Sequence, residues 1–107
     1  MFSRIVTMKL KQNQNSVSDL TKAIDEKVLP ILQKQAGFKN AVFCASPNGT
    51  EAISLTVWDR KENAESYNQN TYPQVLQTLT ALLDGSPNVK SLDVISSTLN
   101  QKIPTPV

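Results

Sequence analysis

The chain has 107 residues, which is the size of one domain with its own core, and no change of composition divides it. Eleven basic and nine acidic residues leave a net charge of +2 that is not gathered into a basic stripe, and this argues against a nucleic-acid partner. The chain has no histidine and one cysteine. Histidine-based catalysis, histidine-containing zinc sites, cysteine-only metal sites and an intrachain disulfide are therefore excluded.

The first segment, residues 2–10, alternates as a strand does. One face is expected to carry Phe2, Arg4, Val6, Met8 and Leu10, and the other Ile5, Thr7 and Lys9. This pattern differs from the continuous apolar core of a signal peptide. No apolar run in the chain approaches the ~20 residues that cross a bilayer, so we expect a cytoplasmic protein without membrane contact.

A long helix is predicted after a polar loop. Ser16, with Asp19 three residues later, has the spacing of a capping box and predicts the start of the helix. Pro30 cannot donate to the carbonyl of Glu26, so it should kink or loosen the last turn. Gly37 is expected to end the helix. The apolar stripe consists of Val17, Leu20, Ile24, Val28, Ile31 and Leu32.

Residues 38–46 and 51–58 predict a β-hairpin, because Asn48 and Gly49 between them tolerate positive φ. On the first of these strands we expect Phe38, Asn40, Val42 and Cys44 to share one face, opposite Ala41, Phe43 and Ala45. On the second we expect an apolar face of Ile53, Leu55 and Val57 and a mixed face of Ala52, Ser54, Thr56 and Trp58.

The second helix is expected to begin at Asp59, an acidic N-cap with Glu62 as its three-residue partner. Pro73 predicts a break near residues 70–72. A last strand is predicted over residues 89–98, with Leu92 and Val94 on one face and Ile95 on the other. The proline-containing tail, residues 100–107, should lie extended. The buried stripe of the two helical segments consists of Ala64, Tyr67, Val75, Leu76, Leu79, Leu82 and Leu83.

The order strand, helix, strand, strand, helix, strand predicts an α+β, ferredoxin-like βαββαβ domain over residues 1–107, with an antiparallel sheet and both helices on one face. The strands carry apolar residues on both sides, so we expect a second copy to cover the free face and to complete a homodimer. The alternative is a monomer whose free face is semi-polar, with Ser54, Thr56 and Ser91 on it.

Three features resemble the antibiotic biosynthesis monooxygenase family of the dimeric α+β barrel superfamily. They are a long helix ending in Gly37 and Phe38, the strand from Ile53 to Trp58, and the segment from Asp59 to Tyr67. The similarity spans about residues 2–99. It implies homodimers with a pocket between sheet and helices in each subunit. Characterised members include cofactor-independent oxygenases of polycyclic aromatic phenols and haem-degrading enzymes.

The haem-degrading branch of the family uses an Asn on the first strand and a Trp and a His on the second helix. An ungapped match places Tyr67 at the Trp position and Gln77 at the His position, and the first strand offers Thr7 instead of an Asn. Without an imidazole, haem iron loses its usual axial ligand. We therefore expect neither haem nor any other cofactor or metal.

A candidate ligand pocket follows from this resemblance. Its three aromatic residues would stack on a flat ligand, its three polar residues would orient hydroxyl groups, and Arg4 would stabilise a phenolate. The candidates are Thr7, Trp58, Tyr67, Asn68, Tyr72 and Gln77.

Each candidate also has a structural explanation. Trp58 and Tyr67 would pack in the core, Tyr72 would anchor the helix break, Arg4 would pair with a carboxylate across the sheet, and the polar helix residues would be exposed. Cys44 is expected to be an inert core residue.

The sequence thus supports two hypotheses. The first is a cofactor-independent monooxygenase acting on a small aromatic or hydrophobic metabolite. The second is a non-catalytic dimer that binds a small ligand or acts as an accessory module. Peroxide or stress-related detoxification is a third possibility, which rests on superfamily analogy alone.

Overall fold

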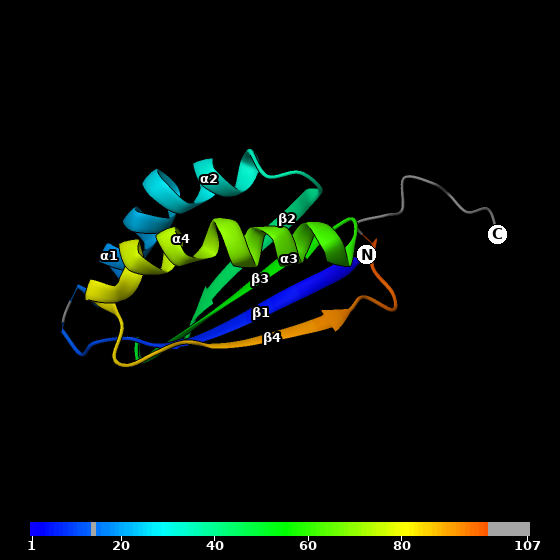
Figure 1. The fold of residues 1–107 in the computed structure, drawn as a ribbon. Helices are drawn as coiled ribbons and strands as arrows, with labels where there is room; N and C mark the ends of the chain where they lie inside the picture. The colour runs from blue at the N-terminus through cyan, green and yellow to red at the C-terminus, as the bar shows by residue number, and fades with distance from the viewer. Residues whose placement is uncertain (14, 99–107) are drawn as a thin grey trace.

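The computed structural model describes residues 1–13 and 15–98, and Figure 1 shows their fold. Four antiparallel strands form one sheet in the order β2-β3-β1-β4. The strands are β1 (Phe2–Lys9), β2 (Phe38–Ala45), β3 (Glu51–Trp58) and β4 (Asn88–Asp93). The first helix consists of α1 (Ser16–Ala23), η1 (Ile24–Val28) and α2 (Leu29–Gln33). The second helix consists of α3 (Lys61–Asn70), α4 (Tyr72–Leu79) and η2 (Thr80–Leu82).

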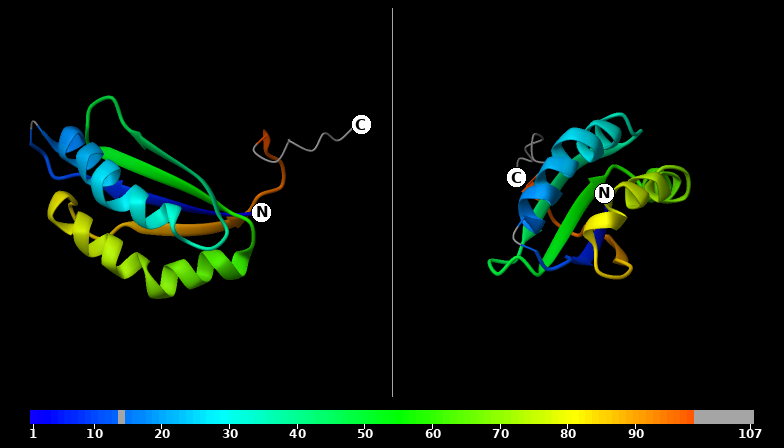
Figure 2. Two further views of the ribbon diagram at one scale, coloured as in Figure 1. Left: turned by 90° about the horizontal axis from the view of Figure 1, so that it is seen from above. Right: turned by 90° about the vertical axis from the view of Figure 1, so that its left-hand side faces the viewer.

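Both helices cover the same face of the sheet, as the two views of Figure 2 show. Together with the strand order, this confirms the predicted α+β, ferredoxin-like βαββαβ fold. The core lies between that face and the helices. No helix in the described ranges combines the length and the apolarity that spanning a membrane requires.

The irregularity that Pro30 causes in the first helix extends further than predicted, into the turn before the proline. The turn before the proline, η1, is a π-helix, in which the N–H of Leu29 bonds to the carbonyl of Ile24 five residues earlier. Pro30 has no N–H to donate, so the regular α-helical ladder is interrupted here. Ser16 does not cap the helix as predicted: the N-cap is Asn15, with no side-chain cap bond, and the Ser16 hydroxyl bonds to the loop carbonyl of Lys11 instead.

The predicted hairpin of β2 and β3 is confirmed, but the face predicted for Phe38 and the burial predicted for Cys44 were wrong. A β-bulge between Phe38 and Asn40 turns Phe38 to the helix side, where it, like Ala41 and Phe43, packs against the core. Cys44 is exposed on the free face rather than buried in the core.

On β3 the mixed face, not the apolar one, points toward the helices. Ser54 and Thr56 are buried beside the core, whereas Ile53 is 43% exposed on the free face. Ser54 and Thr56 have the same parity along the strand as Trp58, which is fully buried, so they lie on the same side of the sheet as Trp58. The alternative that placed them on the free face was therefore wrong. Ser91 is exposed but pairs with Arg4, and so belongs to the helix side of the sheet too.

The last two elements also differ from the prediction at their ends. The second helix has Arg60, not Asp59, as its N-cap, and the Asp59 carboxylate accepts a hydrogen bond from the Asn63 side chain at 2.8 Å. The predicted break before Pro73 is confirmed at Thr71.

β4 ends at Asp93 rather than at Thr98. Asp93 pairs with Phe2, and just beyond the strand the N–H of Val94 donates a hydrogen bond of 3.0 Å to the carbonyl of Met1. Ile95 lies beyond the strand and is exposed. The predicted extended tail falls outside the described residues.

The free face of the sheet carries several apolar side chains in the described structure. Val42, Ile53 and Leu92 are 47%, 43% and 44% exposed. Ile5 and Leu55 pair between them at the centre of the face and are half-buried. An exposed apolar strip across a sheet is typical of an interaction surface.

Candidate functional site

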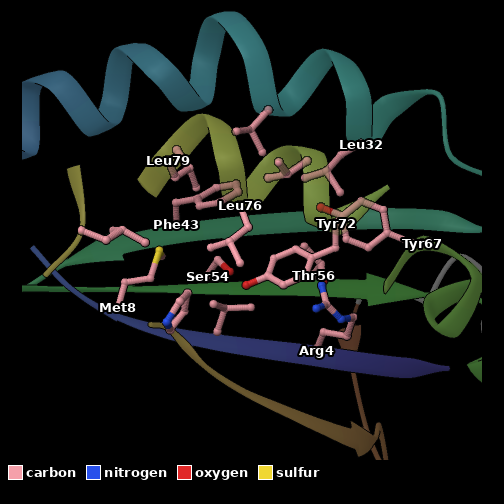
Figure 3. Close-up of a pocket in the computed structure, with 15 residues that line it drawn as sticks. Arg4, Met8, Leu32, Phe43, Ser54, Thr56, Tyr67, Tyr72, Leu76 and Leu79 are labelled. Atoms are coloured by element: carbon pink, nitrogen blue, oxygen red, sulfur yellow. The ribbon is translucent and has the colours of Figure 1, made fainter. Parts of the chain in front are cut away.

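A cavity lies between the sheet and the two helices that cover it. One end is polar, with Arg4, Thr56, Tyr67 and Tyr72, and the other is apolar, as Figure 3 shows. About 30 Å³ of the cavity is open to water, and the space between its side chains is about 420 Å³ when the mouth is included. Because a bound water needs ~10–15 Å³ of such volume, the cavity has room for two or three waters.

Arg4 is the main electrostatic feature of this cavity. It is 3% exposed, and its Nη2 donates a hydrogen bond of 2.9 Å to Oδ1 of Asn68. A guanidinium has five N–H donors, and this bond uses one of them. Within the described residues no carboxylate pairs with Arg4, contrary to the structural explanation predicted for it. The cavity therefore contains a buried positive charge that is not neutralised by an acidic side chain.

Aromatic rings take the place of a carboxylate around Arg4. Its guanidinium carbon lies 4.5 Å from the ring centroid of Tyr72 and 5.2 Å from that of Tyr67. The two tyrosine rings are 6.2 Å apart, and Tyr67 is in turn 5.1 Å from the Trp58 ring. Ring faces attract a cation without neutralising it, so this arrangement retains the charge of Arg4 for an anion.

Two hydroxyl-bearing residues of β3 complete the cavity wall. Thr56 Oγ1 accepts a 3.0 Å hydrogen bond from Nε1 of Trp58. Ser54 lines the cavity, and its hydroxyl has no hydrogen-bond partner within the part of the chain that the structure describes. A ligand in the cavity could thus bond to Ser54 without displacing an existing contact.

Burial determines the protonation of the polar end. It raises the pKa of Tyr67 to about 12, and it also raises the pKa of Tyr72, although Arg4 opposes both shifts. Burial lowers the pKa of Arg4, while the charge interactions with both tyrosines act in the opposite direction. At neutral pH the two tyrosines are hydrogen-bond donors, and neither is a base.

The structure brings together some of the predicted pocket residues. Tyr67 and Tyr72 line the cavity. Asn68 lies behind Arg4 and holds it through the hydrogen bond described above. Trp58 does not line the cavity: it is 0% exposed and packs behind Tyr67, with its other side edge-on to Phe38.

The remaining two candidates lie away from the cavity. Thr7 has odd parity on β1, whereas Arg4 has even parity, so Thr7 projects from the free face opposite Ile53. Gln77 is exposed on α4, because Val75 and Leu79 of that helix are its buried residues.

Sequence reasoning missed the apolar end and the hydroxyls of the cavity. Met8, Phe43 and Leu79 form that end, and Ser54 lies between the ends. The signal for Ser54 was present in the sequence: once Trp58 is placed under the helices, every second residue of β3 must face them.

The described ranges contain no group of three or more histidine, cysteine, aspartate or glutamate side chains that could hold a metal ion.

Comparison with solved structures shows the fold. A monooxygenase from the gene ActVA-Orf6 of Streptomyces coelicolor, in complex with the ligand nanaomycin D, is 18% identical over 90% of this chain and 88% of its own, with a TM-score of 0.77. SnoaB, a cofactor-independent oxygenase from Streptomyces nogalater, is 9% identical over 97% of each chain, with a TM-score of 0.69. A Nitrosomonas europaea protein assigned to the antibiotic biosynthesis monooxygenases is 11% identical over 90% of this chain and all of its own, with a TM-score of 0.72.

These structures share the fold that the sequence resemblance implied, at sequence identities that show the fold alone. No protein-family model matches the sequence, and no curated protein is similar to it at a significant level.

Proposed function

We propose that this chain is a dimeric antibiotic biosynthesis monooxygenase-type protein that binds a flat aromatic phenol in the Arg4 cavity and oxidises it with molecular oxygen. Neither a metal nor a flavin is needed for this reaction. The observation that carries the proposal is the buried Arg4, which faces two tyrosine rings and, among residues 1–13 and 15–98, no carboxylate. The likeness of the fold to a monooxygenase and to a cofactor-independent oxygenase supports it.

The proposed reaction balances without an external reductant. A phenol with a free ring C–H reacts with O₂ to give a quinone and one molecule of water. One oxygen atom becomes the new quinone carbonyl, and the other leaves as water with the phenolic proton and the ring hydrogen. Loss of the phenolic proton makes the ring electron-rich, and Arg4 stabilises the resulting negative charge.

Proton removal is the step that the residues of the cavity assist least. Its titratable lining residues are Arg4, Tyr67 and Tyr72, and burial keeps both tyrosines protonated. The proton must therefore leave through water at the mouth, which restricts the substrates to phenols or anthrones that ionise readily.

This absence of a general base among the lining residues favours a second candidate function. In it, the chain is a non-catalytic dimer that binds an aromatic anion and releases it unchanged. Both candidates use the same cavity and the same Arg4, so they differ in turnover and not in binding.

Oxygen consumption separates the two candidates. A panel of naphthols, hydroquinones and anthrones is offered to the wild-type chain, to Arg4→Met and to the matched control Arg60→Met, in which the one other arginine, exposed at the start of α3, is replaced. The enzyme predicts oxygen uptake above the rate without protein for wild type and the control, lost in Arg4→Met. Saturable binding without uptake supports the non-catalytic candidate.

The proposed dimer uses the free face of the sheet. Its exposed apolar residues Val42, Ile53 and Leu92 would pack against the same face of a second copy. Sedimentation of the wild-type chain at micromolar concentration should give a species of twice the chain mass of 11.8 kDa. Ile53→Glu should give the monomer, and a monomeric wild type would contradict the dimer.

A further inference from the structure

A second apolar space lies beside the candidate cavity, on the other side of Met8 and Phe43. It is a groove between the first helix and the β2–β3 hairpin, and about 230 Å³ of it is open to water, compared with about 30 Å³ in the cavity. Met8 and Phe43 line both spaces. They therefore form a partition, with the apolar end of the cavity on one side and the water-accessible groove on the other.

Binding of a fused-ring ligand requires some side chains of the cavity to move. Ligand pockets usually have ~300–1,000 Å³, and only about 30 Å³ of this cavity is open to water. Leu32, Val75 and Leu79 are buried in the hydrophobic core, so moving them would sacrifice close packing on every side.

The partition residues can move at a lower cost. Phe43 is only partly buried, and its side chain borders the water-accessible groove. Met8 is buried but unbranched, and methionine adapts readily to a change in its surroundings. Displacement of either side chain into the groove places it in water-accessible space that is lined mostly by apolar residues.

The irregular turn of the first helix lies over this partition. Ile24 lines the groove and Val28 lines the cavity, and these residues are the first and last of the π-helical segment η1. π-Helical turns are frequent at functional sites. The part of the helix that Pro30 makes irregular therefore covers both the cavity and the groove.

We propose that Met8 and Phe43 are a movable partition that determines which ring systems the site accepts. An aromatic phenol binds with its hydroxyl at Arg4 and pushes these side chains into the groove, so the occupied site includes space that is now outside the cavity. The substrate class is a phenol of two or more fused rings, and the room behind Phe43 limits the ring number. This inference rests on the proposed function of the Arg4 cavity.

Calorimetric titration with a two-ring naphthol and a three-ring anthrol tests the partition. In Phe43→Ala the preference for anthrol over naphthol should rise about tenfold, the effect of about two additional buried methylene-sized groups. Phe43→Val should shift the preference in the same direction and is a milder change to the core. Ala45→Leu fills the groove from its outer side, so it should weaken naphthol binding by about fivefold or more, about one methylene-sized group.

Ala81→Leu is the matched control, because Ala81 is exposed on η2 and lines neither space. It should leave both affinities unchanged. If wild type binds naphthol and neither the Phe43 variants nor Ala45→Leu shift the affinities relative to the control, the partition is wrong and the Arg4 cavity stands. If wild type binds neither naphthol nor anthrol, the proposed function itself fails, and the partition fails with it.

Discussion

The guanidinium carbon of Arg4 lies 4.5 Å from the centroid of the Tyr72 ring, at the polar end of a mostly apolar cavity. Tyr67 places a second ring 5.2 Å away. Such contacts contribute ~0.5–2 kcal/mol each but leave the charge in place. A buried charge without a counter-ion is costly to the fold, and in the proposed function a bound aromatic anion supplies the counter-charge.

Arg4→Met should therefore reduce ligand binding without a large loss of stability. The methionine fills much of the same volume and removes the cost of burying a charge, so we expect the free energy of unfolding to change by less than ~1 kcal/mol, in either direction. Chemical denaturation measures this change. If Arg4 were a structural residue, Arg4→Met would cost several kcal/mol, whereas Arg60→Met would cost almost nothing.

The two tyrosines give the site an alkaline signature. They are the only tyrosines of the chain, and burial raises the pKa of Tyr67 from 10.0 to about 12. Below pH 10 the residue is protonated in both folded and unfolded chains, so it does not change stability with pH. Between about pH 10 and pH 12 the unfolded chain loses the proton and the folded chain keeps it, so stability falls by about 2–3 kcal/mol.

Near-ultraviolet absorbance of tyrosinate tests this directly. The tyrosines of the folded chain should ionise at higher pH than those of the chain in denaturant. In Tyr67→Phe only the raised pKa of Tyr72 should remain, so the loss of stability at alkaline pH should be smaller. Ionisation of both tyrosines near pH 10 in the folded chain would show that the cavity is open to water.

Thr56 should be needed for the packing of Trp58. In Thr56→Val the indole Nε1 loses its acceptor while Trp58 remains fully buried, and an unpaired buried donor costs ~1–3 kcal/mol. Thr56→Ser keeps the acceptor and removes one methyl group, at a cost of ~1 kcal/mol. Equal loss of stability in the two variants would rule out a role for the hydrogen bond.

Gly37 and Gly85 allow the same substitution to be compared at a crowded and at an open position. Both have positive φ, 78° and 86°, but a Cβ on Gly37 would lie 2.2 Å from Oδ1 of Asp59 and 2.9 Å from Cβ of Asn63, whereas nothing lies within 4 Å of one on Gly85. Gly85→Ala should therefore cost only the ~1–2 kcal/mol of a left-handed alanine. Gly37→Ala should cost ~1–3 kcal/mol more, because it also displaces the hydrogen-bonded side chains. Thermal unfolding compares the two, and similar midpoints would contradict the close packing.

The sequence predicted the fold because strand and helix periods are local signals. The faces of β2 and β3 were harder to assign. A bulge after Phe38 reverses its side, and a bulge has no reliable mark in a single sequence. The side of Ser54 followed from Trp58, whose burial under the second helix sets the parity of β3.

The candidate site was only partly predictable. Tyr67 and Tyr72 were found because they lie on the helix that covers the sheet. Thr7 was misplaced, although the alternation of β1 already separated it from Arg4. The lack of a carboxylate beside Arg4 in the described part of the chain depends on three-dimensional packing and leaves no pattern in the sequence. The same is true of the groove beside Phe43.

The proposed function depends most on Arg4 as the receptor for an aromatic anion. Fluorescence of Trp58, the single tryptophan of the chain, reports on the cavity because its ring lies 5.1 Å from that of Tyr67. Titration with a naphthol should quench it saturably in wild type and in Arg60→Met. In Arg4→Met the affinity should fall about tenfold or more, the effect of losing one charge-assisted hydrogen bond. Equal affinity in all three chains, or no saturable quenching in wild type, would contradict the account.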